Sequence, residues 1–586
     1  MSSLKRTHTC GALRAEHAGQ SVTLMGWVAK WRDHGGVIFI DLRDRYGVTQ
    51  VVFNPKNDEI YQHAKHLRAE FVIAVSGEVE QRLEGKANKN LATGEIEVRA
   101  GELTILNPAK TPPFNIDDEF EASEELRLKY RYLDLRRPTM QKNLLLLHRV
   151  YQVVRRFFDD HDFIEIETPI LMRSTPEGAR DYLVPSRLQH GKFYALPQSP
   201  QTYKQILMAA GFDRYYQIVK CFRDEDLRAD RQPEFTQIDV EMSFVEADDV
   251  LALIENLMTE VMAQCVDVKI QTPFRRLTYR EAMDQYGSDK PDTRFGLELV
   301  DVSAIVQGCD FRVFNDTLAH GGTIKGLCIP GAANYSRSKI DKLTELIKNL
   351  GAKGLVAIKI GSDDWDSNLA KFFSAEMRQS VKRQFKANAG DLLLIVADKR
   401  ERANPVLGGL RTHIAEAERM IPENEFSILW VTAFPLLDYD EEEKRYNAMH
   451  HPFTSPMEED LPKLESAPGE VRARAYDLVI NGNEIAGGSI RIHKRELQNK
   501  IFSLLNIQEQ EARNKFGFLL DAFEFGAPPH GGIAFGFDRL IMLLAGRKTI
   551  RDVIAFPKTN NAVSLMDGSP NEVDKRQLKE LGILIT

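Results

Sequence analysis

The sequence predicts a multidomain protein in which a β-rich N-terminal module precedes a mixed α/β body. Two patterns predict this fold class. Short runs of strand-like composition fill the first 110 residues, and helical spacing alternates with strand-like runs in the rest of the chain. The length of 586 residues allows about three to five domains. A chain of this size can bury a core that needs neither a metal nor a disulfide for folding.

The composition excludes several classes of protein. The five cysteines are scattered and form no CxxC pair, which excludes a zinc ribbon and a disulfide framework. The N-terminus has no apolar signal region and no apolar run approaches the roughly 18 residues of a membrane span, so we expect a cytoplasmic protein with no membrane partner. The net charge of −8 argues against a basic nucleic-acid coat.

The charge is unevenly distributed along the chain. Residues 1–110 hold 15 Lys and Arg against 13 Asp and Glu, so they carry +2 while the rest of the chain carries −10. This asymmetry favours a polyanionic partner at the N-terminus.

The N-terminal module has the pattern of a five-stranded barrel. Its strand-like runs are separated by turn signals and lie at 21–30, 37–43, 48–53, 71–80 and 95–106. Helical spacing occurs once, at 59–67, between the third and fourth runs. This is the pattern of an OB-fold, which binds single-stranded nucleic acid with aromatic and basic side chains on one face. Arg32, Phe39 and Gln50 are candidates for that face, although Phe39 could equally be barrel core and Arg32 a solvated charge.

Changes in composition divide the remainder of the chain. A segment at 111–125 that is rich in proline and acidic residues predicts a linker. Helical spacing at 147–157 is followed by strand-like alternation at 164–167, and the character changes again from about 290 to 422, where a helix at 339–350 and a strand at 354–360 indicate an inserted α/β unit. We therefore expect a barrel at 1–108, a linker at 109–140, a body in two parts at 141–288 and 423–560, an insertion at 289–422 and a C-terminal extension at 561–586.

The densest polar segment lies at 220–241. Strand-like runs at 215–219 and 236–242 flank a loop in which arginines alternate with acidic residues, which predicts an antiparallel hairpin with a long charged loop. If these charges form solvated ion pairs, each pair contributes about 0–1 kcal/mol to stability. Arginines held by neighbouring carboxylates also preorganise a phosphate clamp, and the loop alone leaves both interpretations open.

A second candidate site lies near the C-terminus. The segment 530–540 reads as a glycine-spaced strand that enters a helix at Arg539. Glycines allow close approach of backbone or ligand, and an arginine at that point can reach a phosphate or stack on a flat ring. The segment matches neither a Rossmann fingerprint nor a P-loop.

Taken together, these segments resemble the class II aminoacyl-tRNA synthetases. The helix and strand that end at Pro169 resemble motif 1, the charged hairpin from Arg223 to Phe235 resembles motif 2, and Gly532–Arg539 resembles motif 3. Further segments resemble the bacterial-type aspartyl-tRNA synthetases over nearly the whole chain, at 175–187, 193–205, 448–456 and 487–493.

The resemblance implies a fold, a reaction and a set of site residues. The fold is an OB-fold barrel followed by an antiparallel-sheet catalytic domain with an inserted α/β domain, assembled as a homodimer through motif 1. The reaction is the ATP-dependent activation of L-aspartate and its transfer to tRNA(Asp), with Arg223, Glu225 and Arg539 as catalytic residues. The residues implied for ATP are Arg223, Glu225, Gln232, Phe235, Glu484 and Arg539, and those implied for Mg²⁺ are Asp477 and Glu484.

The resemblance also implies how the amino acid and the tRNA are selected. The residues implied for aspartate are Glu177, Ser199, Gln201, Lys204, Asp239, His450, His451 and Arg491. The residues implied for binding the tRNA anticodon are Arg32, Phe39 and Gln50. His34 and Gly85 stand where enzymes strict for tRNA(Asp) tend to carry Leu and a longer, often basic residue, which implies that tRNA(Asn) is charged as well.

Three alternatives remain open at this stage. The first is an aspartyl enzyme that is strict for tRNA(Asp). The second is a non-catalytic RNA-binding paralogue, which we would expect to have lost Arg223, Glu225, Glu484 or Arg539. The third is a free-standing ligase that makes asparagine, a relative that lacks the anticodon barrel.

Overall fold

The computed structural model describes residues 5–119, 122–175, 178–362 and 364–585. The chain divides into two compact units, and each is described by itself. The first comprises residues 1–148, 227–229 and 549–573, and the second comprises 149–226, 230–548 and 574–586.

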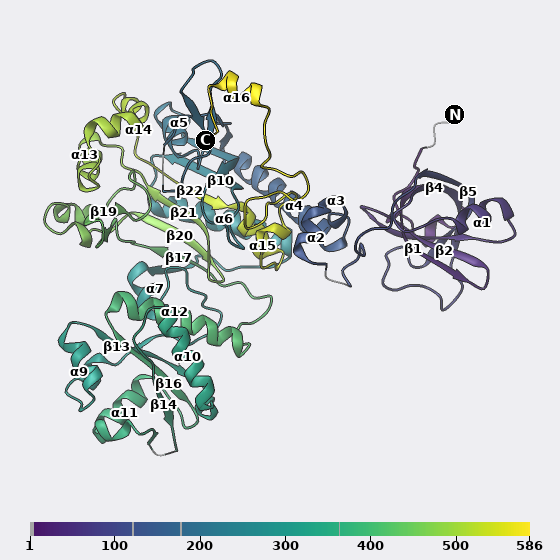
Figure 1. The fold of residues 1–586 in the computed structure, drawn as a ribbon. Helices are drawn as coiled ribbons and strands as arrows, with labels where there is room; N and C mark the ends of the chain where they lie inside the picture. The colour runs from purple at the N-terminus through teal and green to yellow at the C-terminus, as the bar shows by residue number, and fades with distance from the viewer. Residues whose placement is uncertain (1–4, 120–121, 176–177, 363, 586) are drawn as a thin grey trace. The chain divides into compact units, whose positions relative to one another are not determined.

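The first unit begins with a closed five-stranded barrel in the order β1-β2-β3-β5-β4, drawn in purple in Figure 1. Its elements are β1 (Ser21–His34), β2 (Val37–Asp44), β3 (Gly47–Phe53), α1 (Asp58–Lys65), β4 (Val72–Gln81) and β5 (Ile96–Asn107). Alternate residues of β1 to β3 point into the barrel, where Leu24, Ile40 and Val51 are fully buried. The predicted OB-fold is confirmed.

The first strand is longer than the sequence predicted. It continues to His34 because Gly35 and Gly36, at φ +61° and +84°, form a tight turn that returns the chain directly into β2. His34 therefore pairs with Val37, and Arg32 pairs with Phe39. The extension places Arg32, which lay beyond the predicted strand, on a regular hairpin opposite Phe39.

The segment predicted as a linker contains two short helices, α2 (Glu124–Lys129) and α3 (Arg131–Asp134). Ser123 caps α2 by accepting a hydrogen bond from the Leu126 backbone N–H. The longer α4 (Pro138–Asp160) follows, and its residues from Arg149 onward belong to the second unit. The first unit also contains the 3₁₀ turn η6 (Ile550–Asp552).

The second unit is built on an eight-stranded sheet in the order β11-β17-β20-β21-β22-β10-β9-β6. Its inner strands are antiparallel, while the outer pairs β11–β17 and β6–β9 are parallel. The strands are β6 (Ile164–Glu165), β9 (Arg214–Phe222), β10 (Glu234–Ser243), β11 (Arg275–Thr278), β17 (Ile428–Thr432), β20 (Ala475–Ile480), β21 (Asn483–Ile490) and β22 (His530–Gly536). Its helices are α5 (Gln201–Ala209), α6 (Ala247–Val266), α7 (Tyr279–Tyr286), α13 (Arg495–Leu504), α14 (Glu509–Phe523) and α15 (Phe537–Leu544).

Two sequence predictions for this sheet are corrected. The strand expected at 489–492 begins earlier, at Asn483, because Asn481 and Gly482 both have positive φ and form a two-residue hairpin turn between β20 and β21. The strand expected at 164–167 is only two residues long. The charged hairpin itself is confirmed, since β9 and β10 pair antiparallel from Phe222 and Glu234 onward.

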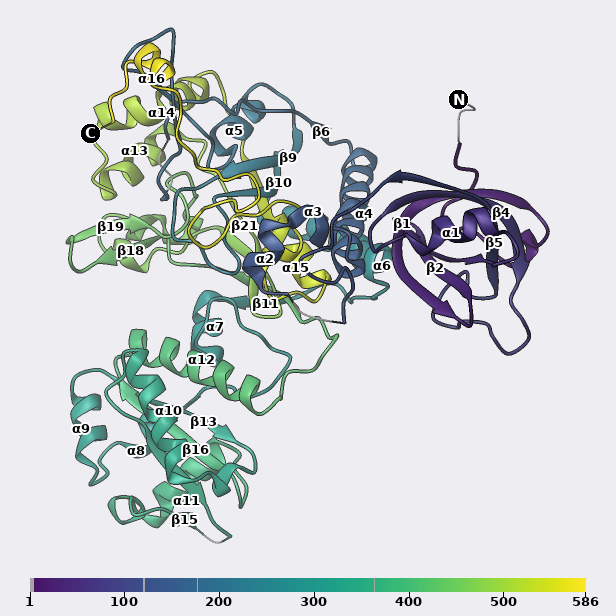
Figure 2. The ribbon, with the colours of Figure 1, turned by 45° about the vertical axis from the view of Figure 1, so that its right-hand side comes forward.

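The inserted α/β segment has its own five-stranded antiparallel sheet, in the order β12-β13-β16-β14-β15, and Figure 2 shows helices around it. The strands are β12 (Val300–Asp301), β13 (Thr323–Ile329), β14 (Val356–Ile360), β15 (Trp365–Asp366) and β16 (Leu392–Asp398). The helices are α8 (Ser303–Val306), α9 (Arg312–Ala319), α10 (Arg337–Asn349), α11 (Ala375–Gln384) and α12 (Arg400–Ala417).

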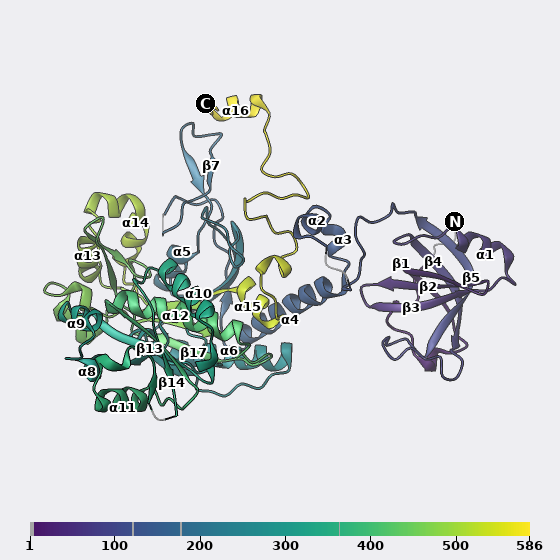
Figure 3. The ribbon, with the colours of Figure 1, turned by 60° about the horizontal axis from the view of Figure 1, so that its bottom comes forward.

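Two small hairpins and a final helix complete the second unit. The hairpins are β7 (Leu183–Pro185) with β8 (Phe193–Ala195) and β18 (Leu437–Asp440) with β19 (Arg445–Ala448), and the helix is α16 (Lys575–Leu581). Figure 3 shows α16 beside the hairpin of β7. Among the described residues, no helix is both long enough and apolar enough to cross a membrane.

Candidate active site and anticodon face

The centre of the second unit holds a buried group of four charged side chains. Lys204 comes from α5, Asp239 and Glu241 from β10, and Arg491 from the residue after β21, and all are at most 5% exposed. Asp239 and Glu241 are two residues apart on one strand, so both point to the same face of the sheet. Lys204 lies between the two carboxylates, and Glu241 lies between the two cations.

The distances within this group define its pairing. Lys204 Nζ lies 2.8 Å from Asp239 Oδ1 and 3.2 Å from Glu241 Oε2. Arg491 Nε donates to Glu241 Oε1 at 3.0 Å, and its Nη1 donates to Ser489 Oγ at 2.8 Å. Asp239 Oδ2 has no hydrogen-bond partner among the described residues. That oxygen is therefore available to a ligand cation.

The two carboxylates respond differently to burial. Burial raises the pKa of Asp239, and Lys204 only partly offsets the rise. Burial also works against the charged form of Glu241, but Arg491 and Lys204 outweigh it and lower its pKa to about 2. Glu241 is thus a permanent anion that fixes both cations.

Glu241 was not among the residues that the sequence singled out. A signal was present, because Glu241 follows Asp239 by two residues on a predicted strand, and β10 places both on one face. Gly532 on the adjacent β22 leaves room for Glu241, since a Cβ there would lie 2.1 Å from Glu241 Oε2. The glycine spacing of this strand therefore serves the packing of the sheet at Gly532, where the sequence suggested approach by a ligand.

Neighbouring residues of the expected aspartate set surround the start of α5. Ser199 Oγ accepts a hydrogen bond from the Gln201 backbone N–H at 3.3 Å. Gln201 is buried, and its Nε2 has no partner within the described part of the chain. Glu177, also expected here, lies outside the described residues.

A second group of acidic side chains lies over the β20–β21 hairpin. Asp477 and Glu484 converge on Gly487, because a Cβ there would lie 2.9 Å from Asp477 Oδ1 and 3.5 Å from Glu484 Oε1. His450 Nε2 is 3.6 Å from Asp477 Oδ1. His451 stacks on Phe453 at 5.1 Å, so the two adjacent histidines face different partners.

The electrostatics of this second group follow from burial and crowding. Burial raises the pKa of Asp477 to about 6; His450 opposes the rise, while Glu484 and Asp289 add to it. Burial opposes protonation of His450, yet Asp477 and the nearby carboxylates raise its pKa overall. Two carboxylates around a side-chain-free position fit Mg²⁺ shared with substrate phosphates. No group of three or more potential metal ligands occurs among the described residues.

The charged β9–β10 loop and the start of α15 both contribute arginines near this loop or near Glu484. The Arg223 guanidinium lies over the Phe235 ring at 5.2 Å, and Arg231 pairs with Glu225 at 3.2 Å. Arg539, at the start of α15, donates to the Glu484 carbonyl at 2.7 Å and to Asp230 Oδ2 at 3.0 Å. The structure thus joins Arg539 to Glu484 and to the β9–β10 loop that contains Gln232. Asp230 was missed as a partner of Arg539, since the two are 309 positions apart.

On the barrel, the expected anticodon residues form one connected row. Arg32 donates to both oxygens of Asp41 at 2.8 and 2.7 Å, and Gln50 Nε2 donates to Glu97 Oε2 at 2.8 Å. Phe39 is half-buried between the fully buried Ile38 and Ile40, so it lies on the opposite face from the core. Asp41 and Glu97 were not predicted, because they are recognised only from the strand pairing.

Of the two residues expected to govern tRNA choice, His34 is the last residue of β1 and Gly85 lies in a turn. The His34 ring meets Phe39 edge-on at 6.1 Å. Gly85 has φ +75° and no atom within 4 Å of where a Cβ would stand.

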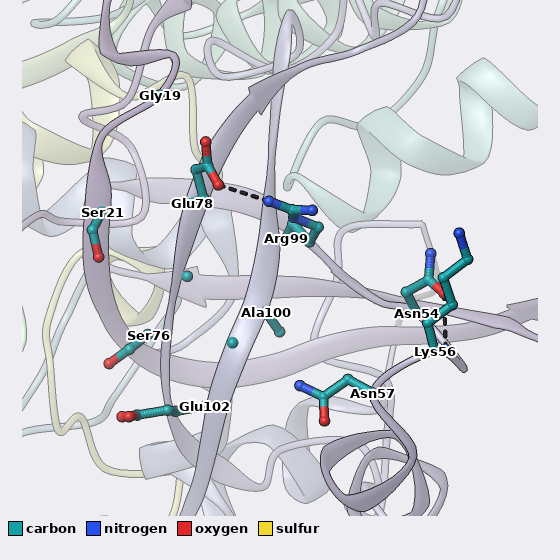
Figure 4. Close-up of a pocket in the computed structure, with 12 residues that line it drawn as sticks. Gly19, Ser21, Asn54, Lys56, Asn57, Ser76, Glu78, Arg99, Ala100 and Glu102 are labelled. Atoms are coloured by element: carbon teal, nitrogen blue, oxygen red, sulfur yellow. Dashed lines mark hydrogen bonds and ion pairs between the residues drawn. The ribbon is translucent and has the colours of Figure 1, made fainter.

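The barrel also carries a polar hollow of about 910 Å³ (Figure 4). Its lining includes Lys56 and Arg99, but also Glu78 and Glu102, and Arg99 is paired with Glu78 at 2.7 Å. None of the expected anticodon residues lines it. The charges of the hollow cancel, so we assign it no ligand.

Comparisons with known proteins agree with this geometry. A family model described as "tRNA synthetases class II (D, K and N)" matches residues 123–560, and one described as "OB-fold nucleic acid binding domain" matches residues 22–106. The "Aspartate--tRNA(Asp/Asn) ligase" of Desulfatibacillum aliphaticivorans is 57% identical over 100% of this chain and 98% of its own length. The protein of the same name from Moorella thermoacetica is 56% identical over 100% of this chain and 98% of its own.

Solved structures show the same fold at much lower identity. The asparaginyl-tRNA synthetase from Pyrococcus horikoshii complexed with asparaginyl-adenylate is 18% identical, with a TM-score of 0.59, and the match covers 95% of this chain and 98% of that chain. The aspartyl tRNA synthetase from Entamoeba histolytica is 19% identical, with a TM-score of 0.58, and covers 95% and 92%.

Proposed function

The chain belongs to the class II tRNA synthetases of the D, K and N group, and we propose that it is an aspartate–tRNA ligase that acts on tRNA(Asp) and tRNA(Asn). In the first step the aspartate α-carboxylate attacks the α-phosphate of ATP, which gives aspartyl-adenylate and releases pyrophosphate. In the second step the terminal adenosine hydroxyl of the tRNA attacks the adenylate carbonyl and releases AMP. Because its tRNA substrates serve translation, we place the enzyme in the cytoplasm.

The observation that carries the choice of aspartate is the buried pair of cations, Lys204 and Arg491. We propose that both bind the side-chain carboxylate of the substrate, with the planar fork of Arg491 providing a bidentate contact. Asp239 Oδ2, with Glu177, then serves the substrate ammonium, while Ser199 and Gln201 add hydrogen bonds. Neutral asparagine would leave two desolvated cations underpaired, which costs several kcal/mol.

The remaining residues position ATP. We propose that Arg223 binds the α-phosphate, that Phe235 stacks on one face of the adenine, and that Arg539 covers the other face and reaches the γ-phosphate. Glu225 and Gln232 hold the adenosine and the tRNA end. The hydrogen bonds from Arg539 to Glu484 and Asp230 support its role, because they fix the guanidinium before the substrate arrives.

Asp477 and Glu484 are the residues that would hold Mg²⁺. The ion would neutralise charge on the substrate phosphates, as is usual where few protein ligands are available. His450, whose pKa is raised by Asp477, adds positive charge at the same place, and His451 lies beside it in sequence. The chemistry then rests on positioning and on stabilisation of charge, with no covalent intermediate on the protein.

For the tRNA, we propose that Phe39 stacks on an anticodon base while Arg32 and Gln50 read base edges or phosphates. The edge-on contact of His34 with Phe39 and the unobstructed, left-handed position of Gly85 favour a permissive reading of the last anticodon base. The relatives named "Aspartate--tRNA(Asp/Asn) ligase" support the same specificity.

We also propose a homodimer through motif 1. Large apolar side chains near Pro169 support it, because Ile164, Ile170 and Leu171 are about half exposed. An exposed apolar group of this kind is typical of an interaction surface.

The test is aspartylation of purified tRNA(Asp) and tRNA(Asn) side by side. We expect comparable rates on both. A rate on tRNA(Asn) lower by several orders of magnitude would leave a strictly discriminating enzyme. Absence of aspartate-dependent pyrophosphate exchange would leave a non-catalytic RNA-binding protein.

A further inference from the structure

The tip of the charged loop, Leu227–Ala229, is fastened to a segment near the C-terminus of the chain. Both belong to the first compact unit. The Ala229 carbonyl accepts a hydrogen bond from the Ile550 backbone N–H at 3.0 Å and a second from Thr549 Oγ1 at 3.0 Å. Ala229 directly precedes Asp230, whose carboxylate holds Arg539. Fixing this carbonyl therefore fixes the main chain from which Asp230 projects.

The C-terminal segment is in turn held by one buried arginine. Arg131 Nη2 donates to the carbonyls of Arg551 at 2.5 Å and Ile554 at 2.8 Å, and its Nε donates to the Ala555 carbonyl at 2.9 Å. Three carbonyls within five residues are thus bound by a single guanidinium. Arg131 is only 2% exposed, so these bonds are shielded from water.

Arg131 is itself oriented by Asp134. Asp134 Oδ2 accepts from Arg131 at 2.6 Å, and Oδ1 accepts from Arg127 at 3.0 Å and from Arg137 at 3.3 Å. Arg127 also reaches Asp552 at 2.8 Å. We call Asp134 with these three arginines the Asp134 cluster.

The composition of this cluster points to a role beyond packing. Asp134 has no exposed surface, and burying a carboxylate with three arginines costs desolvation energy that apolar side chains of similar volume would avoid. What the charges provide is a fixed geometry, since each directional hydrogen bond specifies where the 549–555 segment lies.

We propose that the Asp134 cluster and Thr549 are positioning residues for ATP, acting through the Ala229 carbonyl and Asp230 on the guanidinium of Arg539. The inference rests on the proposed role of Arg539 in ATP binding. It assigns a function to residues that contact neither ATP nor aspartate in that role. Loss of the contact should weaken ATP binding and leave aspartate binding intact.

Thr549→Val is the decisive variant, because it keeps the shape of the side chain and removes the hydroxyl, which donates to the Ala229 carbonyl and also accepts from the Arg551 backbone N–H at 3.3 Å. Thr549→Ser retains the hydroxyl and should rescue. Thr559→Val is the matched control, since Thr559 lies in the same segment and its hydroxyl likewise accepts a local hydrogen bond from a backbone N–H, that of Val563, at 3.3 Å. Asp134→Asn tests the cluster itself.

The measurements are the Kd for ATP by calorimetry without aspartate and the KM values for ATP and aspartate in pyrophosphate exchange. For Thr549→Val we expect ATP binding weaker by about three- to tenfold, the effect of the lost hydrogen bond to the Ala229 carbonyl, with an unchanged KM for aspartate. Thr549→Ser and Thr559→Val should match the wild type. Asp134→Asn should weaken ATP binding in the same direction.

An unchanged Kd for ATP in Thr549→Val overturns the proposal. If, in addition, Asp134→Asn lowers the melting temperature and impairs kcat and the KM values for ATP and aspartate together, the cluster is structural only. Wild-type protein without aspartate-dependent exchange refutes the proposed function instead, and the ATP titrations still decide whether Thr549 positions the loop.

Discussion

Glu241 offers the sharpest test of how the amino-acid pocket is built. The change is Glu241→Gln, which keeps the size of the side chain and removes its charge. The carboxylate accepts from Arg491 Nε and lies 3.2 Å from Lys204 Nζ. In the variant, the amide presents one oxygen instead of two, and its NH₂ group cannot accept from either cation. Both cations then lose their shared anion in a site closed to water.

The magnitude follows from the pKa of Glu241, which its partners lower from 4.5 to about 2. This fall corresponds to ~3 kcal/mol in favour of the charged form. Since the folded-state pKa is depressed, the contribution is fully present above the ordinary pKa and is lost only as the pH falls through about 2. The difference between variant and wild type should therefore be constant from neutral to alkaline pH. A loss of this size lowers the melting temperature of a unit this large by roughly 3–4 °C.

Thermal unfolding with and without L-aspartate is the assay. We expect the free variant to melt earlier than the wild type and to recover part of the loss at saturating aspartate, because the substrate carboxylate replaces the missing anion. Glu255→Gln is the control: Glu255 is also buried, but it accepts from the Phe274 N–H and Trp430 Nε1, which are neutral donors. If Glu241→Gln melts like the wild type, or if aspartate stabilises both proteins equally, Glu241 is not the anion that holds this pocket.

Three further predictions concern the substrate, the metal and the assembly. Lys204→Met should lower kcat/KM for aspartate by about 10²–10³-fold, the cost of one lost buried ion-pair contact, with little change in ATP affinity by calorimetry; comparable losses for both substrates would contradict it. The pKa of Asp477 is raised to about 6, so its carboxyl is protonated below that pH. The Mg²⁺ concentration for half-maximal pyrophosphate exchange should therefore rise as the pH is lowered from 8 to 6. Asp477→Asn should abolish this dependence, and a wild-type Mg²⁺ requirement that does not change with pH would count against Asp477 as a ligand. Ile170→Glu should shift the molar mass measured by light scattering from dimer to monomer, whereas an unchanged mass would place the interface elsewhere.

The sequence was most informative where the structure depends on local periodicity. The five barrel strands, the β9–β10 hairpin and α15 all lie close to where alternation or helical spacing predicted them. In the barrel these signals survive because β1 to β3 each have one face in the core, so a polar residue in the wrong register would be buried without a partner. The Asn481–Gly482 turn carried an equally local signal, and reading it would have moved the start of β21 to Asn483.

Contacts between distant positions could not be predicted in this way. Arg539 was identified as a candidate, but Asp230, the carboxylate that orients it, is known only because the loop and α15 meet in the folded chain. The same holds for Asp41 beside Arg32, which depends on the pairing of β1 with β2. Sequence spacing says which face of a strand a residue occupies, but not which strand lies next to it.

These paired carboxylates explain why net charge was a poor guide to function. Three of the arginines proposed to meet a substrate already have an anion: Arg491 has Glu241, Arg539 has Asp230, and Arg32 has Asp41. An unpaired buried arginine would be costly and poorly oriented, so each site that binds an anion adds about as much negative charge as positive charge to the composition. A substrate carboxylate or phosphate then joins an arginine that is already oriented, and its affinity depends on the donors that the protein's own carboxylate leaves free. The chain can therefore be acidic overall and still bind ATP, aspartate and tRNA, because binding is decided by the direction of individual N–H groups and not by the sum of charges.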